Sequence, residues 1–117
     1  MSDNTGIWKI AILGLDDSIL ELAWRCCRVN FEIVGIYHSP HEEALRGALR
    51  LGCSAYSTPD FVAQGCDLIL KSPHFELPPA ADKQAFWIQP LDASSNHPER
   101  LKQFYEALET AEKALPS

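Results

Sequence analysis

The sequence lacks the features that mark membrane-spanning, secreted and nucleic-acid-binding proteins. No apolar run approaches the roughly 18–20 residues that a membrane span requires, and the polar stretch from Met1 to Gly6 has no basic-then-apolar signal peptide. Positive charge is scarce: 10 Lys and Arg residues stand against 16 Asp and Glu, and the net charge is −6. This balance excludes a clustered basic footprint. We therefore expect a cytoplasmic protein with neither membrane nor nucleic acid as partner.

Cysteine is present, but not in a spacing used for metal binding or redox chemistry. Cys26 and Cys27 are adjacent, Cys53 and Cys66 stand alone, and no C-x-x-C pair exists. Zinc sites and thioredoxin-type motifs depend on such pairs. We expect four reduced, mostly buried cysteines and no metal site.

Apolar and helical patterns alternate along the 117 residues, which is a length typical of one domain. The patterns predict strands at 8–13, 31–37, 55–57, 67–71 and 86–89, and helices at 18–30, 42–51, 58–64 and 97–115. Right-handed crossovers then produce an α/β fold with a three-layer, doubly wound, mostly parallel, Rossmann-like sheet. We expect a single domain over residues 8–115 after a disordered N-terminal tail, residues 1–7.

The first predicted helix is apolar over an arc roughly 200° wide, more than one sheet contact needs. A second stripe, which contains Trp24, lies beside the stripe that faces the sheet. Two hypotheses explain what covers Trp24. Either the Trp24 face and the C-terminal helix bind a second copy or another protein, or that helix, with Phe104 and Tyr105, covers Trp24 within one monomer. In the next helix we expect Ala44, Leu45, Ala48 and Leu49 to face inward.

Four segments resemble the N-terminal domain of the glucose–fructose oxidoreductase / inositol dehydrogenase (Gfo/Idh/MocA) family. They are Lys9–Leu15, Phe31–Tyr37, Ala55–Asp60, and Trp87–Leu91 with the helix from Pro98. The resemblance extends from Trp8 to Ala114 and implies the NAD(P)-binding fold of an oxidoreductase. Family members typically add a larger C-terminal domain that holds substrate and builds the oligomer, and we expect this chain to act without one.

The phosphate-binding loop departs from the family pattern. In G-x-G-x-x-G the second glycine lets backbone approach the pyrophosphate and the third lets helix and strand pack closely. Here the loop is Gly14-Leu15-Asp16-Asp17-Ser18-Ile19, so only the first glycine remains. Asp16 places a carboxylate where a phosphate would lie, but the favoured interpretation is that it simply caps the helix that follows, because Asp is a preferred cap residue on any helix.

The end of the second predicted strand also departs from the pattern. A cofactor-binding carboxylate is expected there to accept from the ribose hydroxyls, but the chain has His38 and Ser39, with His41 shortly after. These residues are compatible with a ribose phosphate, as in NADP-using proteins, or with an ordinary polar turn. A metal site at His38 and His41 is a minor alternative, because no third ligand is near in sequence.

The chemical machinery of the family is missing as well. By alignment Ile88, Gln89 and Pro90 match a Glu-Lys-Pro motif, and the amide of Gln89 cannot replace an ammonium group as proton donor. Ser72-Pro73-His74 resembles the turn near the nicotinamide. Only about a dozen residues then separate it from the next strand, enough for about one helical turn near residues 80–84.

These departures lead to a prediction of a degenerate NAD(P)-binding-fold module that acts through protein association, a pseudoenzyme without catalytic residues or cofactor. The alternative is an NAD- or NADP-binding oxidoreductase, or a subunit of one whose substrate site another chain supplies. In both cases the crevice at the carboxyl ends of the strands is the predicted cofactor cleft, vestigial or functional. Its predicted lining is Gly14, Leu15, Asp16, His38, Ser39, Ser72, Pro73 and His74.

Overall fold

The computed structural model describes residues 7–78, 81 and 85–115, and its centre is a five-stranded sheet in the order β2–β1–β3–β4–β5. The first four strands are parallel and β5 runs antiparallel to β4. The strands are β1 (Lys9–Leu13), β2 (Glu32–Tyr37), β3 (Leu68–Lys71), β4 (Trp87–Gln89) and β5 (Ser94–Ser95). Beyond β2, Ala55 forms one parallel bridge with Ile36, where the third predicted strand was expected. The order around β1 is that of a Rossmann-like sheet, which confirms the predicted fold class.

In the described part of the chain, the helices α1 (Asp17–Arg28) and α2 (His41–Leu51) and the 3-10 helix η1 (Pro59–Gln64) connect strands, and α3 (Pro98–Lys113) follows the last strand. Gly52 ends α2 in the left-handed conformation, at φ 70°, which glycine adopts without strain. α3 begins after His97, whose ring accepts from the Arg100 N–H at 3.4 Å.

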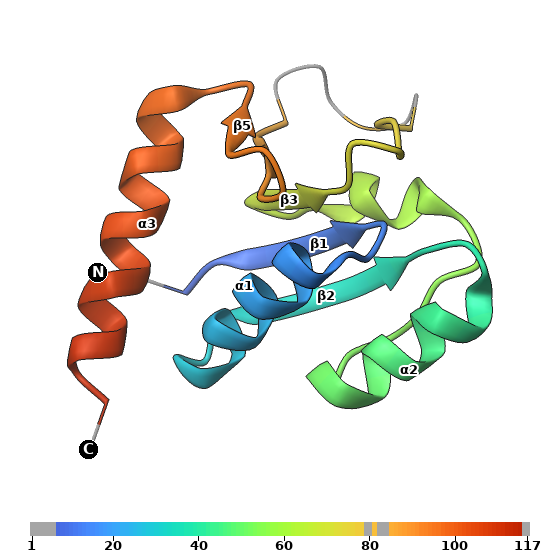
Figure 1. Cartoon of the computed structure of the whole chain (residues 1–117), viewed down its shortest axis with the longest axis horizontal. Helices are drawn as coiled ribbons and strands as arrows, with labels where there is room; N and C mark the ends of the chain where they lie inside the picture. The colour runs from blue at the N-terminus through green and yellow to red at the C-terminus, as the bar shows by residue number, and fades with distance from the viewer. Residues whose placement is uncertain (1–6, 79–80, 82–84, 116–117) are drawn as a thin grey trace.

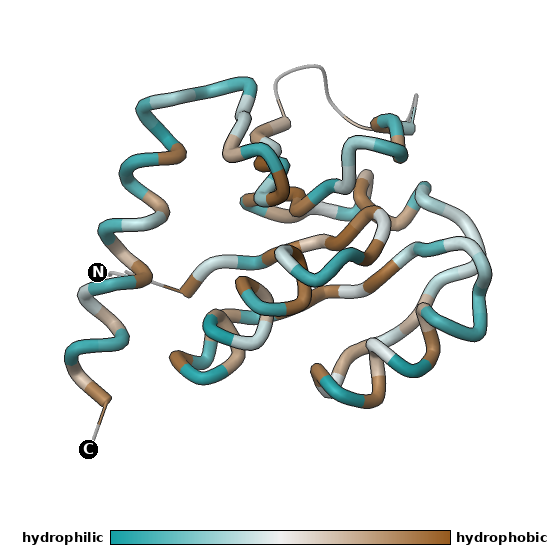
Figure 2. The backbone as a smooth tube through the Cα atoms, in the orientation of Figure 1, coloured by the Kyte–Doolittle hydropathy of each residue, from teal (hydrophilic) through white to brown (hydrophobic). Residues whose placement is uncertain are grey.

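The helices divide unequally between the two faces of the sheet (Figure 1). α1, α2 and α3 pack on the face that carries Ile10, Ile12 and Leu70. The opposite face, with Ala11, Leu13 and Ile69, is covered by η1 and by side chains of the segment between β3 and β4. Because both faces are covered, successive strand residues are apolar, and Figure 2 shows hydrophobic segments along the strands.

The crossover from β3 to β4 covers the second face of the sheet with only a thin layer. Phe75 and Leu77 from the crossover pack against the second apolar cluster, without an α-helix in the described part of the segment. The helical turn predicted near residues 80–84 falls outside the described residues, apart from Ala81. The strand Phe86–Gln89 was predicted to be the last, but the short β5 follows it. Ser95 supports this extra hairpin, since its hydroxyl donates to the Trp87 carbonyl at 2.8 Å.

α3 is attached to one flank of α1. Phe104 and Leu108 are fully buried against the core. Arg25 of α1 donates to both carboxylate oxygens of Glu112, at 2.9 and 2.6 Å. Trp24 is nevertheless 54% exposed, so α3 leaves much of this side chain uncovered.

Two inward-facing predictions for α2 are wrong. Leu45 is 48% exposed and Leu49 is 84% exposed, whereas Ala44 and Ala48 are buried. A helix that packs one narrow stripe on a sheet edge buries only the small residues of that stripe.

Three further observations concern the N-terminal tail, the cysteines and the hydrophobicity of the helices. Of the predicted disordered tail, residues 1–6 lie outside the described residues and Ile7 is exposed. The four cysteines are free, with Cys26 buried and the other three partly buried. No helix within the described ranges is long and apolar enough to cross a membrane.

Candidate functional site

The carboxyl ends of β1, β2 and β3 meet at one edge of the sheet and bring the predicted cleft residues together. The Gly14 N–H, just after β1, donates to the Tyr37 carbonyl at the end of β2 at 2.7 Å. The Ser72 N–H, just after β3, donates to the Leu13 carbonyl at 2.9 Å. Three loops that are distant in sequence therefore lie together at the edge where the cofactor cleft was predicted, as expected for parallel strands.

The loop after β1 is held in place by Gly14 and Asp16. Gly14 has a φ of 88°, a left-handed conformation that favours glycine. Asp16 is the N-cap of α1, and its Oδ1 accepts from the Ile19 N–H at 2.8 Å. Its Oδ2 is buried, with no hydrogen-bond partner among the described residues. A carboxylate thus occupies the helix N-terminus, where an incoming phosphate would otherwise be favoured.

His38 closes the loop from the second strand. Its Nδ1 accepts from the Leu15 N–H at 3.0 Å, which places the proton of the neutral ring on Nε2. Nε2 then donates to Oε1 of Glu43 in α2 at 3.2 Å. One backbone N–H of the loop after β1 is therefore engaged by the imidazole. The sequence predicted His38 in this cleft, but not its hydrogen bond to the loop.

Phe75 lies over Gly14 and was not among the predicted site residues. A Cβ added to Gly14 would lie 2.8 Å from Phe75 Cε1 and 2.8 Å from Ser72 Cβ. The Phe75 ring centroid is 5.4 Å from that of His38 and 6.0 Å from that of Tyr37. The phenyl ring therefore fills space directly above the glycine. The sequence signal was an aromatic residue at the end of the polar turn Ser72-Pro73-His74.

The remaining predicted cleft residues differ in burial. Ser72 is buried and its Oγ accepts from the His74 N–H at 3.4 Å, an interaction that shapes the turn. Ser39, Pro73 and His74 are exposed. The Ser72 hydroxyl thus stabilises the turn, while Phe75 makes the apolar contact with Gly14.

A second polar cluster follows β3 and β4. The Lys71 ammonium lies 5.2 Å from the centroid of the Trp87 ring and donates to the Gln89 side-chain oxygen. The Gln89 amide in turn donates to Asp92 at 3.1 Å and to the Ser94 hydroxyl at 3.0 Å. Burial lowers the pKa of the Lys71 amine, and the charge of Asp92 acts in the opposite direction. Gln89 is thus engaged on both sides of its amide.

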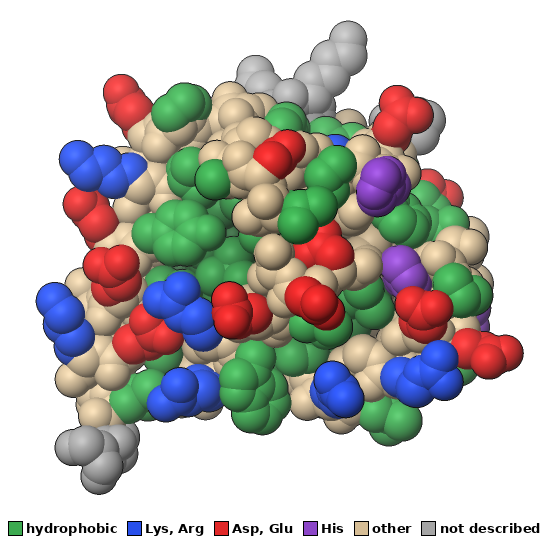
Figure 3. Space-filling model, viewed as in Figure 1, with side chains coloured by type: hydrophobic (Ala, Val, Ile, Leu, Met, Phe, Trp, Pro, Cys, Tyr) green, Lys and Arg blue, Asp and Glu red, His purple; other side chains and the backbone are tan. Residues whose placement is uncertain are grey.

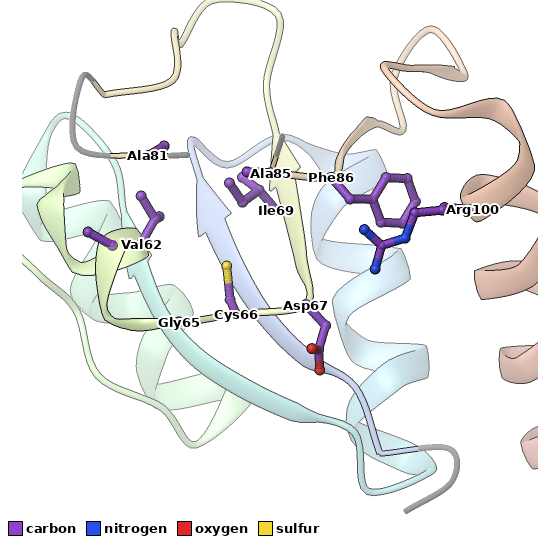
Figure 4. A pocket seen from close by; sticks show the side chains of 10 residues that line it. Val62, Gly65, Cys66, Asp67, Ile69, Ala81, Ala85, Phe86 and Arg100 are labelled. Carbon is purple, nitrogen blue, oxygen red and sulfur yellow. The ribbon is translucent and has the colours of Figure 1, made fainter. Parts of the chain in front are cut away.

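Two hollows border other parts of the fold, although the second is also lined by Leu15 and Asp16 of the predicted cleft. The larger, about 510 Å³, lies beside the start of β3 and is bordered by Cys66, Asp67 and Arg100 (Figure 4). Asp67 accepts from the Lys9 N–H at 2.9 Å, and the Arg100 guanidinium lies over the Phe86 ring. A groove of about 300 Å³ separates the start of α1 from α2. Within the described ranges, no three His, Cys, Asp or Glu side chains are grouped to hold a metal ion.

Neither protein-family models nor curated proteins match this chain. Solved structures do. A Bacteroides fragilis protein described as an NADP oxidoreductase superposes with a TM-score of 0.54 at 21% identity, covering 60% of this chain and 27% of that protein. UDP-N-acetylglucosamine 3-dehydrogenase from Acidithiobacillus ferrooxidans superposes with a TM-score of 0.50 at 17% identity, covering 56% of this chain and 21% of the enzyme. The chain spans about a quarter of the length of these proteins, and the likeness extends to the fold alone. The chain therefore has a Rossmann-like fold of the type found in NAD(P)-dependent oxidoreductases.

Proposed function

We propose that this chain is a degenerate, Gfo/Idh/MocA-like Rossmann module that binds no dinucleotide, catalyses no hydride transfer and acts through association with another protein chain. The observation that carries the proposal is the Phe75 ring above Gly14. In a dinucleotide-binding fold this first glycine makes the tight turn that positions the phosphate-binding loop, and the pyrophosphate approaches the backbone two residues later, where this chain has Asp16. Here the Phe75 ring packs directly on that turn and fills the space beside it.

The electrostatics of the loop support the same conclusion. Asp16 supplies a negative charge to the positive end of α1 and would repel a diphosphate. The Leu15 N–H is bonded to His38, so a phosphate oxygen would have to displace an existing hydrogen bond. A dinucleotide would therefore have to remove the aromatic ring, compete with the imidazole and approach a carboxylate.

Catalysis is disfavoured by the position of Gln89. Its amide has no titrating proton to transfer. Its side chain is hydrogen-bonded to Lys71 and Asp92, and the second of these bonds stabilises the β4–β5 hairpin. Lys71 does carry a titratable amine, but that amine lies against Trp87 and Gln89.

The test is a titration with NAD, NADH, NADP and NADPH, followed by melting temperature and Trp fluorescence. A ligand at 100 times its Kd would stabilise the fold by about 2.7 kcal/mol, which corresponds to about 10 °C for a domain of this size. We expect a shift below about 1 °C at millimolar dinucleotide. A saturable shift at sub-millimolar concentration contradicts the proposal.

Matched variants identify the cause of the expected result. Phe75→Ala removes the ring, Asp16→Gly removes the charge, and the double variant removes both. We expect measurable dinucleotide binding first in the double variant. Ile19 is left in place because it is fully buried in the core, where glycine would leave a cavity. Pro73→Ala, an exposed change in the same turn, is the control and is expected to behave like the wild type.

The alternative function is that of an NAD(P)-binding oxidoreductase subunit whose substrate site another chain supplies. It is favoured by the intact strand–turn–helix frame, in which Gly14 keeps its left-handed conformation, and by the fold of the two solved oxidoreductases. The same titration separates the two functions, since only this alternative requires dinucleotide binding by the wild type.

A further inference from the structure

We infer that a second copy of this chain binds the surface formed by α1 and α2, with a two-fold axis along the groove between these helices. This inference rests on the proposed function, for which it names the partner. We call this surface the α1–α2 face and define it by Asp17, Leu20, Glu21 and Trp24 of α1 and by Leu45, Arg46, Leu49 and Arg50 of α2.

The apolar content of the α1–α2 face is unusual for a surface in contact with water. Five large hydrophobic side chains are exposed in the described part of the chain, and Trp24, Leu45 and Leu49 belong to these two helices. Leu20 adds to them as a lining residue of the groove. Exposed aromatic and aliphatic side chains that cluster on one face mark protein-binding surfaces, where Trp is a preferred anchor.

The charges on this face are divided between the two helices. Asp17 and Glu21 lie one turn apart on α1, and Arg46 and Arg50 lie one turn apart on α2. Asp17, Arg46 and Arg50 line the groove from opposite sides. None of the four makes an ion pair within the described residues. Two neighbouring carboxylates are already engaged, Asp16 as the cap of α1 and Glu43 with His38.

This division of charge fits a second copy. α1 and α2 lie side by side and run in similar directions (Figure 1). A two-fold axis along the groove therefore places α1 of one copy opposite α2 of the other. Asp17 and Glu21 then face Arg46 and Arg50 of the second copy, twice by symmetry. Trp24 lies over the opposing α2, toward its exposed Leu49. Figure 3 shows acidic, basic and hydrophobic side chains interspersed over this side of the molecule.

The opposite flank of α1 is already occupied. Arg25 is bonded to Glu112 of α3, and Phe104 and Leu108 of α3 are buried against the core. The dimer surface therefore comprises α1 and α2, and α3 contributes to it only by fixing the position of α1.

The experiment is sedimentation velocity of the full chain from low micromolar to millimolar concentration. We expect a concentration-dependent monomer–dimer equilibrium in the wild type. Trp24→Glu is expected to weaken the dimer about 100-fold or more, because a central aromatic anchor is lost and a charge is introduced. Leu91→Glu is the matched control: Leu91 is 56% exposed, close to the value for Trp24, but lies after β4. It should leave the dimer unchanged.

Charge reversal provides the sharpest test. One variant carries Arg46→Glu with Arg50→Glu, and the other carries Asp17→Lys with Glu21→Lys. Each alone should be monomeric, because like charges meet across the two-fold axis. An equimolar mixture should form a heterodimer, because opposite charges meet again in both halves. Circular dichroism checks that each variant is folded.

Three results would overturn the inference: a wild type that stays monomeric at millimolar concentration, a dimer that Trp24→Glu leaves intact, or monomeric charge variants that fail to pair when mixed. Dinucleotide titration of the same samples keeps the two proposals separate. Binding of NAD or NADP contradicts the proposed function, whereas a monomer that binds neither contradicts only the second copy as partner.

Discussion

At the scale of single residues, close contacts decide which positions tolerate change. Gly35 in β2 lies under the stacked rings of Tyr56 and Phe61, whose centroids are 4.4 Å apart. Gly47 in α2 faces the methyl groups of Leu15 and Ile36. Both glycines are buried, yet one meets rigid rings and the other meets the ends of flexible side chains. The same substitution should therefore have opposite effects at the two sites.

Gly35→Ala is expected to lower the free energy of unfolding by about 1–3 kcal/mol, the cost of overpacking a filled site. The added Cβ would lie 2.6 Å from Tyr56 Cδ2 and 3.2 Å from Phe61 Cε2. Gly47→Ala is expected to be neutral or to stabilise by up to about 1 kcal/mol, since alanine favours a helix interior and its nearest contact is 3.1 Å. Urea unfolding of both variants measures the difference. Equal destabilisation would contradict this prediction.

At the scale of elements, an ion pair attaches the last helix, α3, to the first helix, α1. The guanidinium of Arg25 and the carboxylate of Glu112 make two charge-assisted hydrogen bonds in parallel. These bonds lower the pKa of Glu112 and raise that of Arg25. The side chains keep 35% and 24% of their surface exposed, so solvent screens much of the interaction.

Glu112→Gln is expected to lower the free energy of unfolding at pH 7 by about 0.5 kcal/mol. Because the pKa of Glu112 is lower in the folded state, its contribution is complete above the unfolded value, near 4.5. That contribution is lost as the pH falls through the folded value. The difference between the wild type and the variant should therefore shrink as the pH falls below about 4.5 and vanish below the folded pKa of Glu112. Chemical unfolding from pH 7 to pH 3 measures this. Glu109→Gln, an exposed change on the same helix, should show no such convergence.

At the scale of the whole molecule, apolar layers cover both faces of the sheet, and cysteine thiols are buried within them. Burial raises the pKa of Cys26 to about 12 and that of Cys53 to about 11. Cys26 is also fully inaccessible in the core beneath α1. Its reactivity therefore reports on the opening of the entire fold, because the thiolate is the nucleophile.

Alkylation of Cys26 by iodoacetamide at pH 8 is expected to proceed only through unfolding. Its rate should rise with urea in parallel with the unfolded population. Cys66, which is partly buried beside the larger hollow, serves as the internal comparison and should react faster in the absence of urea. Peptide mass spectrometry follows each site separately. A Cys26 rate independent of urea would contradict the prediction.

The alternation of apolar strands and amphipathic helices determined the fold, because hydrophobic periodicity and right-handed crossovers leave few ways to arrange β1 to β4. The sequence also predicted which turns meet at the crevice, since parallel strands end at one edge. It did not predict β5, where two serines have no apolar pattern. It also placed Leu45 and Leu49 inward, because a helical stripe does not reveal how wide the surface beneath it is.

Two features of the crevice depended on tertiary structure alone. Nothing local specifies that Phe75, 61 positions beyond Gly14 along the chain, packs over that glycine, or that His38 bonds to the Leu15 N–H. Such contacts arise when the chain brings distant segments together, and their geometry depends on packing in three dimensions. Residue types therefore indicated the fold and the lost glycines, while the contacts of Phe75 and His38 around the loop after β1 and the exposed α1–α2 face became visible only in the folded molecule.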